Sequence, residues 1–158
     1  MVGDAGRVRP GGSQELGGGA GAGAAGVVTE PRFAIGQRAL LVISSGGNVL
    51  WDCVNYIDQA TVAQLEAWGG VQAIAMSHPH TYASVAEWGR AFGAPVYMPW
   101  AAREWLMRLD FPIRYWKGSV EVAPGVTLVQ CGGHFAGSAV LHWADGAGGA
   151  GAFSRGAP

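Results

Sequence analysis

The chain has 158 residues, a net charge of −1 and 49% hydrophobic residues. This length suits a single domain, and the balanced charge excludes the basic footprint of a nucleic-acid-binding protein. No apolar run is long enough to span a bilayer, and the N-terminus lacks the apolar core of a signal peptide. Two cysteines form no disulfide framework and favour a reducing compartment. We therefore expect an intracellular, cytoplasmic protein, with an organelle also open, and without nucleic-acid or membrane partners.

Both ends of the chain have low complexity. Ten of the first thirty residues are glycine, and no hydrophobic period is found among them. Such a segment buries too little apolar surface to offset the entropy of ordering it. The sequence therefore predicts a disordered segment over residues 1–30, one folded domain over 31–145, and a low-complexity tail over 146–158.

The folded part is unusually apolar. Only 13% of the residues are charged, and seven are tryptophan, whereas ordinary domains have about 25% charged residues. A domain this small has difficulty burying so much apolar surface by itself. We therefore expect an exposed apolar sheet face, through which copies of the chain could associate.

Short apolar runs alternate with helical patterns in the first half of the domain. Two β-type runs, 38–44 and 48–52, flank a Gly-Gly turn and predict a hairpin. A helix is predicted over 58–68, with Asp58 as its N-cap. The continuous apolar run 71–76 predicts a strand that ends in a polar loop.

The alternation continues in the second half. Ser84 and Glu87 fit a capping box at the start of a helix that Gly93 ends. The elements predicted after it are a strand over 96–98, a short helix over 101–107, and strands over 126–129 and 139–143. Strands that alternate with helices predict an α/β layered domain.

Three histidines are candidate metal ligands. His78 and His80 lie where the strand over 71–76 gives way to a loop, and residues two apart project to the same side of extended backbone. His134 follows two glycines in a later loop. Three neutral imidazoles leave one position of a tetrahedral zinc ion open for water, which is the arrangement of a catalytic site. The alternative is that these are ordinary loop histidines.

The order of these features resembles the metallo-β-lactamase fold superfamily of metallo-hydrolases. The resemblance covers about residue 32 to about residue 143, and it rests on Trp51-Asp52, His78-x-His80 and Gly133-His134-x-x-Gly137-Ser138. It implies a partial αββα layered domain whose second sheet is largely missing. It also implies that His78, His80 and His134 bind the first zinc ion, and that Asp52 is the strand-end aspartate that helps to shape the site.

The sequence departs from the family pattern in two places. Tyr82 and Ala83 stand where the family has an aspartate and a histidine that serve a second metal. The resemblance therefore implies one zinc ion, with Tyr82 as a residue that could orient water or a substrate oxygen. The family's second half, with its bridging aspartate and final histidine, is not found after residue 146. We therefore expect a fragment of a longer protein, with weak catalysis or none.

Three functions stay open at this point. The resemblance implies a metal-dependent hydrolase that uses zinc-activated water to cleave an ester, thioester or similar bond in a small-molecule substrate that the sequence does not identify. The second function is a non-catalytic zinc-binding or sensing module, in which Cys131 fills the fourth coordination position. The third is an interaction domain that uses the exposed apolar sheet.

Overall fold

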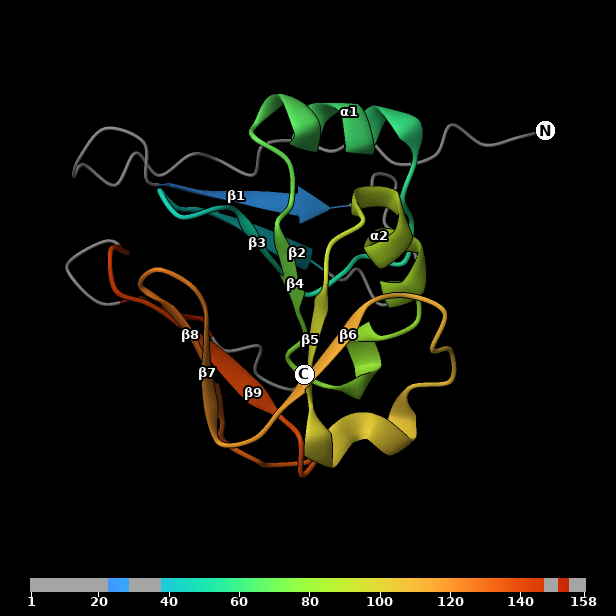
Figure 1. Ribbon diagram of the computed structural model, residues 1–158, viewed down its shortest axis with the longest axis vertical. Helices are drawn as coiled ribbons and strands as arrows, with labels where there is room; N and C mark the ends of the chain where they lie inside the picture. Colours follow the sequence, from blue (N-terminus) through green and yellow to red (C-terminus); the bar gives the residue numbers. More distant parts are fainter. Residues whose placement is uncertain (1–22, 29–37, 147–150, 154–158) are drawn as a thin grey trace.

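Two β-sheets pack face to face in the computed structural model, which describes residues 23–28, 38–146 and 151–153 (Figure 1). The first sheet has six strands in sequence order: β1 (Gly23–Val28), β2 (Arg38–Ile43), β3 (Val49–Trp51), β4 (Ala73–Ala75), β5 (Val96–Pro99) and β6 (Ile113–Trp116). The pairs from β1 to β3 are antiparallel, and those from β3 to β6 are parallel. The predicted hairpin is therefore formed by β2 and β3.

The second sheet is the smaller one. Its four strands are antiparallel and lie in the order β10, β9, β8, β7. Their bounds are Ser119–Ala123 for β7, Val126–Gln130 for β8, Ala139–Trp143 for β9 and Gly151–Phe153 for β10. The first sheet mixes parallel and antiparallel strands and packs between helices and the second sheet. This arrangement confirms the expected α/β layered class.

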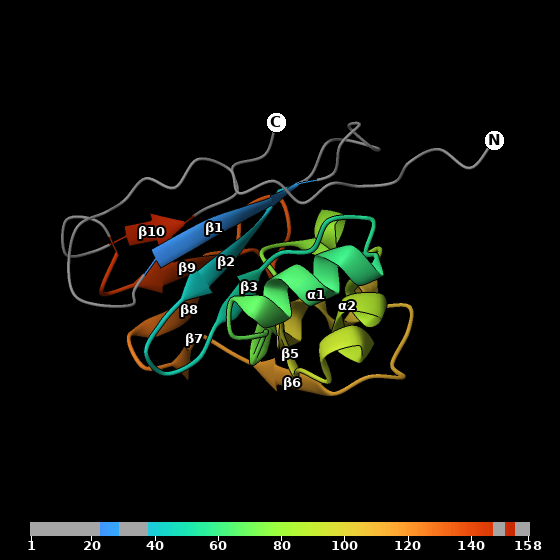
Figure 2. The same ribbon diagram turned by 90° about the horizontal axis from the view of Figure 1, so that it is seen from above.

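Helices cover the face of the first sheet that points away from the second sheet (Figure 2). They are α1 (Gln59–Ala67) and α2 (Val85–Phe92), with the 3-10 helices η1 (Pro79–Thr81) and η2 (Trp100–Trp105). None of the described helices is long and apolar enough to cross a membrane.

The caps of the two α-helices only partly match the prediction. The side chain of Asp58 accepts a hydrogen bond from the backbone of Thr61, as an N-cap does. Gly93 ends α2 with φ 59°, as expected. The predicted capping box is wrong, because the Ser84 hydroxyl donates to the carbonyl of Val54 and Glu87 binds Arg108 instead.

The expected disorder of residues 1–30 is wrong for Gly23–Val28, which form β1. The backbone of this segment pairs with β2 along its whole length, and Val27 is fully buried. An existing strand therefore provides the order that a glycine- and alanine-rich segment lacks by itself. Similarly, β10 lies within the expected tail and pairs with β9. The other residues of both stretches lie outside the described part of the chain.

Two hydrophobic cores cover both faces of the first sheet. One lies between the sheet and the helices and contains Leu50, Ile74 and Trp88. The other lies between the sheets, where Val49 and Leu141 are fully buried. The expected exposed apolar face is therefore not found on the first sheet. Most of the exposed large apolar side chains among the described residues lie in or after η2: Trp100, Trp105, Met107, Leu109 and Tyr115. Self-association stays a prediction.

Candidate metal centre

The loops that follow β3 and β4 meet at one edge of the first sheet. The two strands are parallel neighbours, so the loops at their carboxyl ends lie side by side. Asp52 directly follows β3, and Ser77 and His78 follow β4. The loop from β8 to β9 reaches the same place, because the backbone N–H of Ala139 donates to the carbonyl of Ser77 at 2.8 Å. Residues from both sheets therefore meet here.

Three imidazoles converge at this edge. One ligand atom from each of His78, His80 and His134 lies within 4.8 Å of the other two. The ring centroids are 5.1, 5.2 and 5.4 Å apart. Rings bound through one nitrogen each to a tetrahedral zinc ion at about 2.0–2.1 Å have centroids about 5 Å apart. The three rings therefore have the spacing and the donor chemistry that one metal ion requires.

A hydrogen-bond chain orients the ring of His78. The Ser77 hydroxyl lies 2.7 Å from Nδ1 of His78 and 2.7 Å from one carboxylate oxygen of Asp52. An ionised carboxylate only accepts hydrogen bonds, so the Ser77 hydroxyl donates to Asp52 and accepts from Nδ1–H of His78. In this tautomer Nε2 is the ring nitrogen of His78 that carries the lone pair a metal ion requires.

Asp52 holds both ends of this loop from a buried position. It is fully buried at φ 65°, and it accepts hydrogen bonds from the backbone N–H of Ser77 and from the Thr81 hydroxyl, both at 2.8 Å. Burial and the negative charge of Asp52 raise the pKa of both the Cys53 thiol and the Tyr82 phenol. Asp52 therefore binds residues on both sides of the histidine pair, through the backbone of Ser77 and the hydroxyl of Thr81.

Glycines allow the His134 loop to reach the cluster. Gly132 and Gly133 have φ of 69° and 117°, which side chains disfavour. Gly137 packs so closely on η2 that a Cβ built on it would lie 2.5 Å from the Cβ of Ala102. The ring of Phe135 then lies 4.5 Å from that of His134 and 5.2 Å from that of His80.

Replacing Gly137 with alanine is expected to displace this loop and to cost about 1–3 kcal/mol of the free energy of unfolding, because the added methyl overlaps η2. Urea denaturation measures the loss. Adding Ala102→Gly should restore part of the stability, since it removes the nearest atom of the overlap. Equal stability of Gly137→Ala and the unmodified chain would show that the contact is not close in solution.

The other residues predicted from the sequence, Tyr82 and Cys131, lie outside the group of converging ligand atoms. Tyr82 is buried and its hydroxyl has no hydrogen-bond partner among the described residues, while Ala83 is exposed. Cys131 lines a cavity of about 100 Å³ together with His78 and His134. Its thiol lies 3.5 Å from the carbonyl of Val129 and is outside the group of converging ligand atoms. The closed four-ligand site is therefore not formed in this structure.

Sequence reasoning missed three residues of the site. Ser77 and Thr81 both bind Asp52, and Phe135 packs on two of the histidines. The hydroxyl residues next to the histidine pair are a local signal for Ser77 and Thr81, because a buried strand-end carboxylate requires donors. Nothing local marks Phe135.

No family model matches the chain. It is 50% identical over 121 residues to the uncharacterized protein YmaE of Bacillus subtilis (strain 168), a match that covers 76% of this chain and 44% of that protein. The chain therefore spans less than half the length of this curated relative.

Solved structures with a similar fold include metal-dependent hydrolases. The metallo-β-lactamase MIM-1 from Novosphingobium pentaromativorans matches with a TM-score of 0.56 and 25% identity, over 82% of this chain and 59% of MIM-1. A quorum-quenching N-acyl homoserine lactone lactonase matches with a TM-score of 0.54 and 20% identity, over 72% of this chain and 57% of the lactonase. The chain therefore has the metallo-β-lactamase fold, and its histidine cluster suits the metal site of such proteins.

Proposed function

We propose that the chain is a metal-dependent hydrolase domain that holds one zinc ion through His78, His80 and His134. One observation carries the proposal: three imidazoles converge within 4.8 Å on a fold shared with metal-dependent hydrolases. Imidazole is a preferred zinc ligand, and three protein ligands leave one position open. A zinc ion there would supply activation of water at neutral pH and polarisation of the bond under attack.

The converging ligand atoms favour a single metal ion. Among the described residues, no carboxylate oxygen belongs to the group of converging ligand atoms, so nothing in it suits a second ion. We propose an ester, lactone or thioester as substrate, and the lactonase among the structural neighbours supports this class. The matched region covers only 44% of YmaE. Any activity of a protein of that full length is therefore proposed as well.

A hydrolysis assay tests the proposed function. The zinc-loaded chain should hydrolyse p-nitrophenyl acetate or a simple thioester faster than the chelator-treated chain, because zinc provides the activated water. His134→Ala should lower the rate to that of the chelator-treated chain, since it removes a ligand. His142→Ala is the matched control, because this half-buried histidine of β9 lies outside the cluster. Equal rates for the zinc-loaded chain and His134→Ala would contradict the proposal.

The second candidate is a non-catalytic zinc-binding or sensing module. The observation that favours it is the position of Cys131, a residue that lines the same small cavity as His78 and His134. A thiolate that moved onto the metal would close the position that water requires. Stoichiometric zinc binding without hydrolysis of any ester or thioester would favour this module over the hydrolase.

A further inference from the structure

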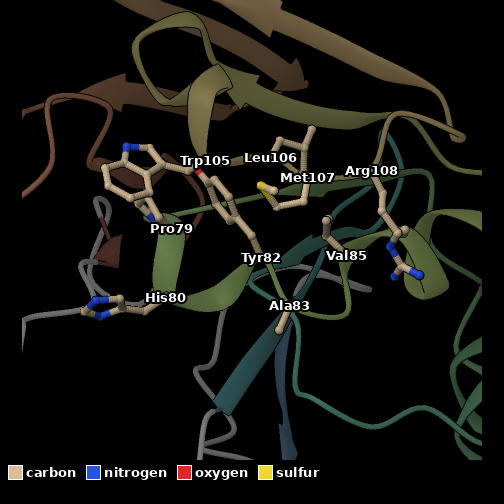
Figure 3. Close-up of a pocket in the computed structure, with 10 residues that line it drawn as sticks. Pro79, His80, Tyr82, Ala83, Val85, Trp105, Leu106, Met107 and Arg108 are labelled. Carbon is tan, nitrogen blue, oxygen red and sulfur yellow. The ribbon is translucent and has the colours of Figure 1, made fainter.

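A cavity of about 290 Å³ adjoins the histidine cluster on its helical side. It is formed by η1, by the start of α2 and by the segment that follows η2 (Figure 3). Figure 3 shows His80 and Arg108 at opposite ends, with Tyr82 and Met107 between them. The residues that line it include His80, Tyr82, Val85, Trp105, Leu106 and Met107.

Aromatic contacts connect this cavity to the cluster. His80 lines the cavity and also belongs to the group of converging ligand atoms. The ring of Trp105 lies 5.3 Å from that of Phe135, which in turn lies 5.2 Å from that of His80. The cavity and the position where a metal ion fits therefore share His80.

The walls of the cavity are mostly apolar, and some of them are exposed to solvent. Trp105 is 51% exposed and Met107 is 89% exposed. Large apolar side chains that remain exposed around a concave surface are typical of a binding site. At the far end, the Arg108 guanidinium donates to both carboxylate oxygens of Glu87. The charge of Arg108 is therefore already matched, and the cavity favours an uncharged, apolar occupant.

We propose that this cavity binds the apolar acyl or alkyl group of the substrate, while the bond that is cleaved lies at the histidine cluster. The assignment of the occupant to a substrate rests on the proposed function. The volume is at the lower end of the range for small-molecule pockets. A short or medium-length linear chain fits it better than a bulky group.

Binding of straight-chain carboxylates tests this proposal without requiring turnover. Butyrate, hexanoate and octanoate are titrated into the zinc-loaded chain by calorimetry. Each methylene that enters the cavity should tighten binding about fourfold until the cavity is full. Trp105→Ala removes a wall, and Ala83→Leu fills the cavity from an exposed position. In both variants the affinity for octanoate should fall about tenfold, and the affinity for butyrate should change by less than about twofold.

The matched control is Trp100→Ala. Trp100 belongs to the same 3-10 helix as Trp105 and is 42% exposed, but it does not line the cavity. It should leave the dependence on chain length unchanged. Equal affinity for the three acids, or equal losses in all three variants, would overturn the proposal.

Ester hydrolysis by the same proteins separates this proposal from the proposed function. Chain-length-dependent binding without any hydrolysis would reject the hydrolase and keep the cavity as an apolar binding site. The other outcome is that Trp105→Ala and Ala83→Leu hydrolyse p-nitrophenyl acetate, butyrate and octanoate at the same rates as the unmodified chain. That result would keep the hydrolase and reject the cavity as its acyl site.

Discussion

Replacing His78 and His80 together with alanine is expected to reduce the bound zinc from one ion per chain to none. These two rings and that of His134 form the cluster, and a single remaining imidazole holds zinc only weakly. Zinc content after purification and dialysis measures the loss directly. The thermal stabilisation by zinc should vanish as well. In the unmodified chain it should reach about 2.7 kcal/mol at a free zinc concentration a hundred times the Kd.

His142→Ala is again the control for this double variant, because it removes an imidazole outside the cluster. It should keep the full zinc content and the full thermal stabilisation. Equal zinc in the double variant and the unmodified chain would show that the metal binds elsewhere. That result would reject both the hydrolase and the zinc-binding module.

Replacing Asp52 with alanine is expected to cost roughly 3–5 kcal/mol of the free energy of unfolding. The change leaves the backbone N–H of Ser77 and the Thr81 hydroxyl without the carboxylate that they bind. It also places an alanine at φ 65°, a backbone conformation that alanine disfavours. Urea denaturation measures the loss, and the folded fraction of this variant should fall visibly.

Asp52→Asn distinguishes the positioning role from bulk stability. Asparagine keeps one acceptor oxygen and tolerates positive φ, so the loss of stability should be smaller, about 1–3 kcal/mol. The amide no longer fixes the Ser77 hydroxyl through two carboxylate oxygens. Zinc affinity should therefore fall about 10- to 100-fold, as for other residues that orient metal ligands. An unchanged zinc affinity in this folded variant would reject the positioning role.

Local patterns in the sequence were sufficient to predict the elements that position His78 and His80. The Gly-Gly turn between β2 and β3, the Asp58 cap of α1 and the apolar run of β4 are all short-range signals. Because His78 and His80 lie within five residues of the end of β4, their place at the sheet edge could be predicted from the same signals. That His134 lies close to this pair could be predicted only from the family resemblance. His134 belongs to the loop between β8 and β9 of the other sheet, and no local pattern connects that loop to β4.

Elements that depend on distant partners could not be predicted. β1 and β10 consist largely of small residues and become strands only by pairing with β2 and β9. β6 was missed because its side chains alternate weakly and its order comes from pairing with β5. The capping box failed for a related reason, since Ser84 binds a carbonyl thirty positions earlier in the chain. The apolar cavity also joins segments whose proximity no local pattern reveals.

X-ray absorption at the zinc edge of the zinc-loaded chain tests the central claim most directly. We predict a first shell made only of nitrogen and oxygen at about 2.0–2.1 Å, with the outer-shell scattering of three imidazoles. A sulfur scatterer at about 2.3 Å would instead place Cys131 on the metal. A shell without imidazole scattering would contradict the assignment of His78, His80 and His134 as the metal site.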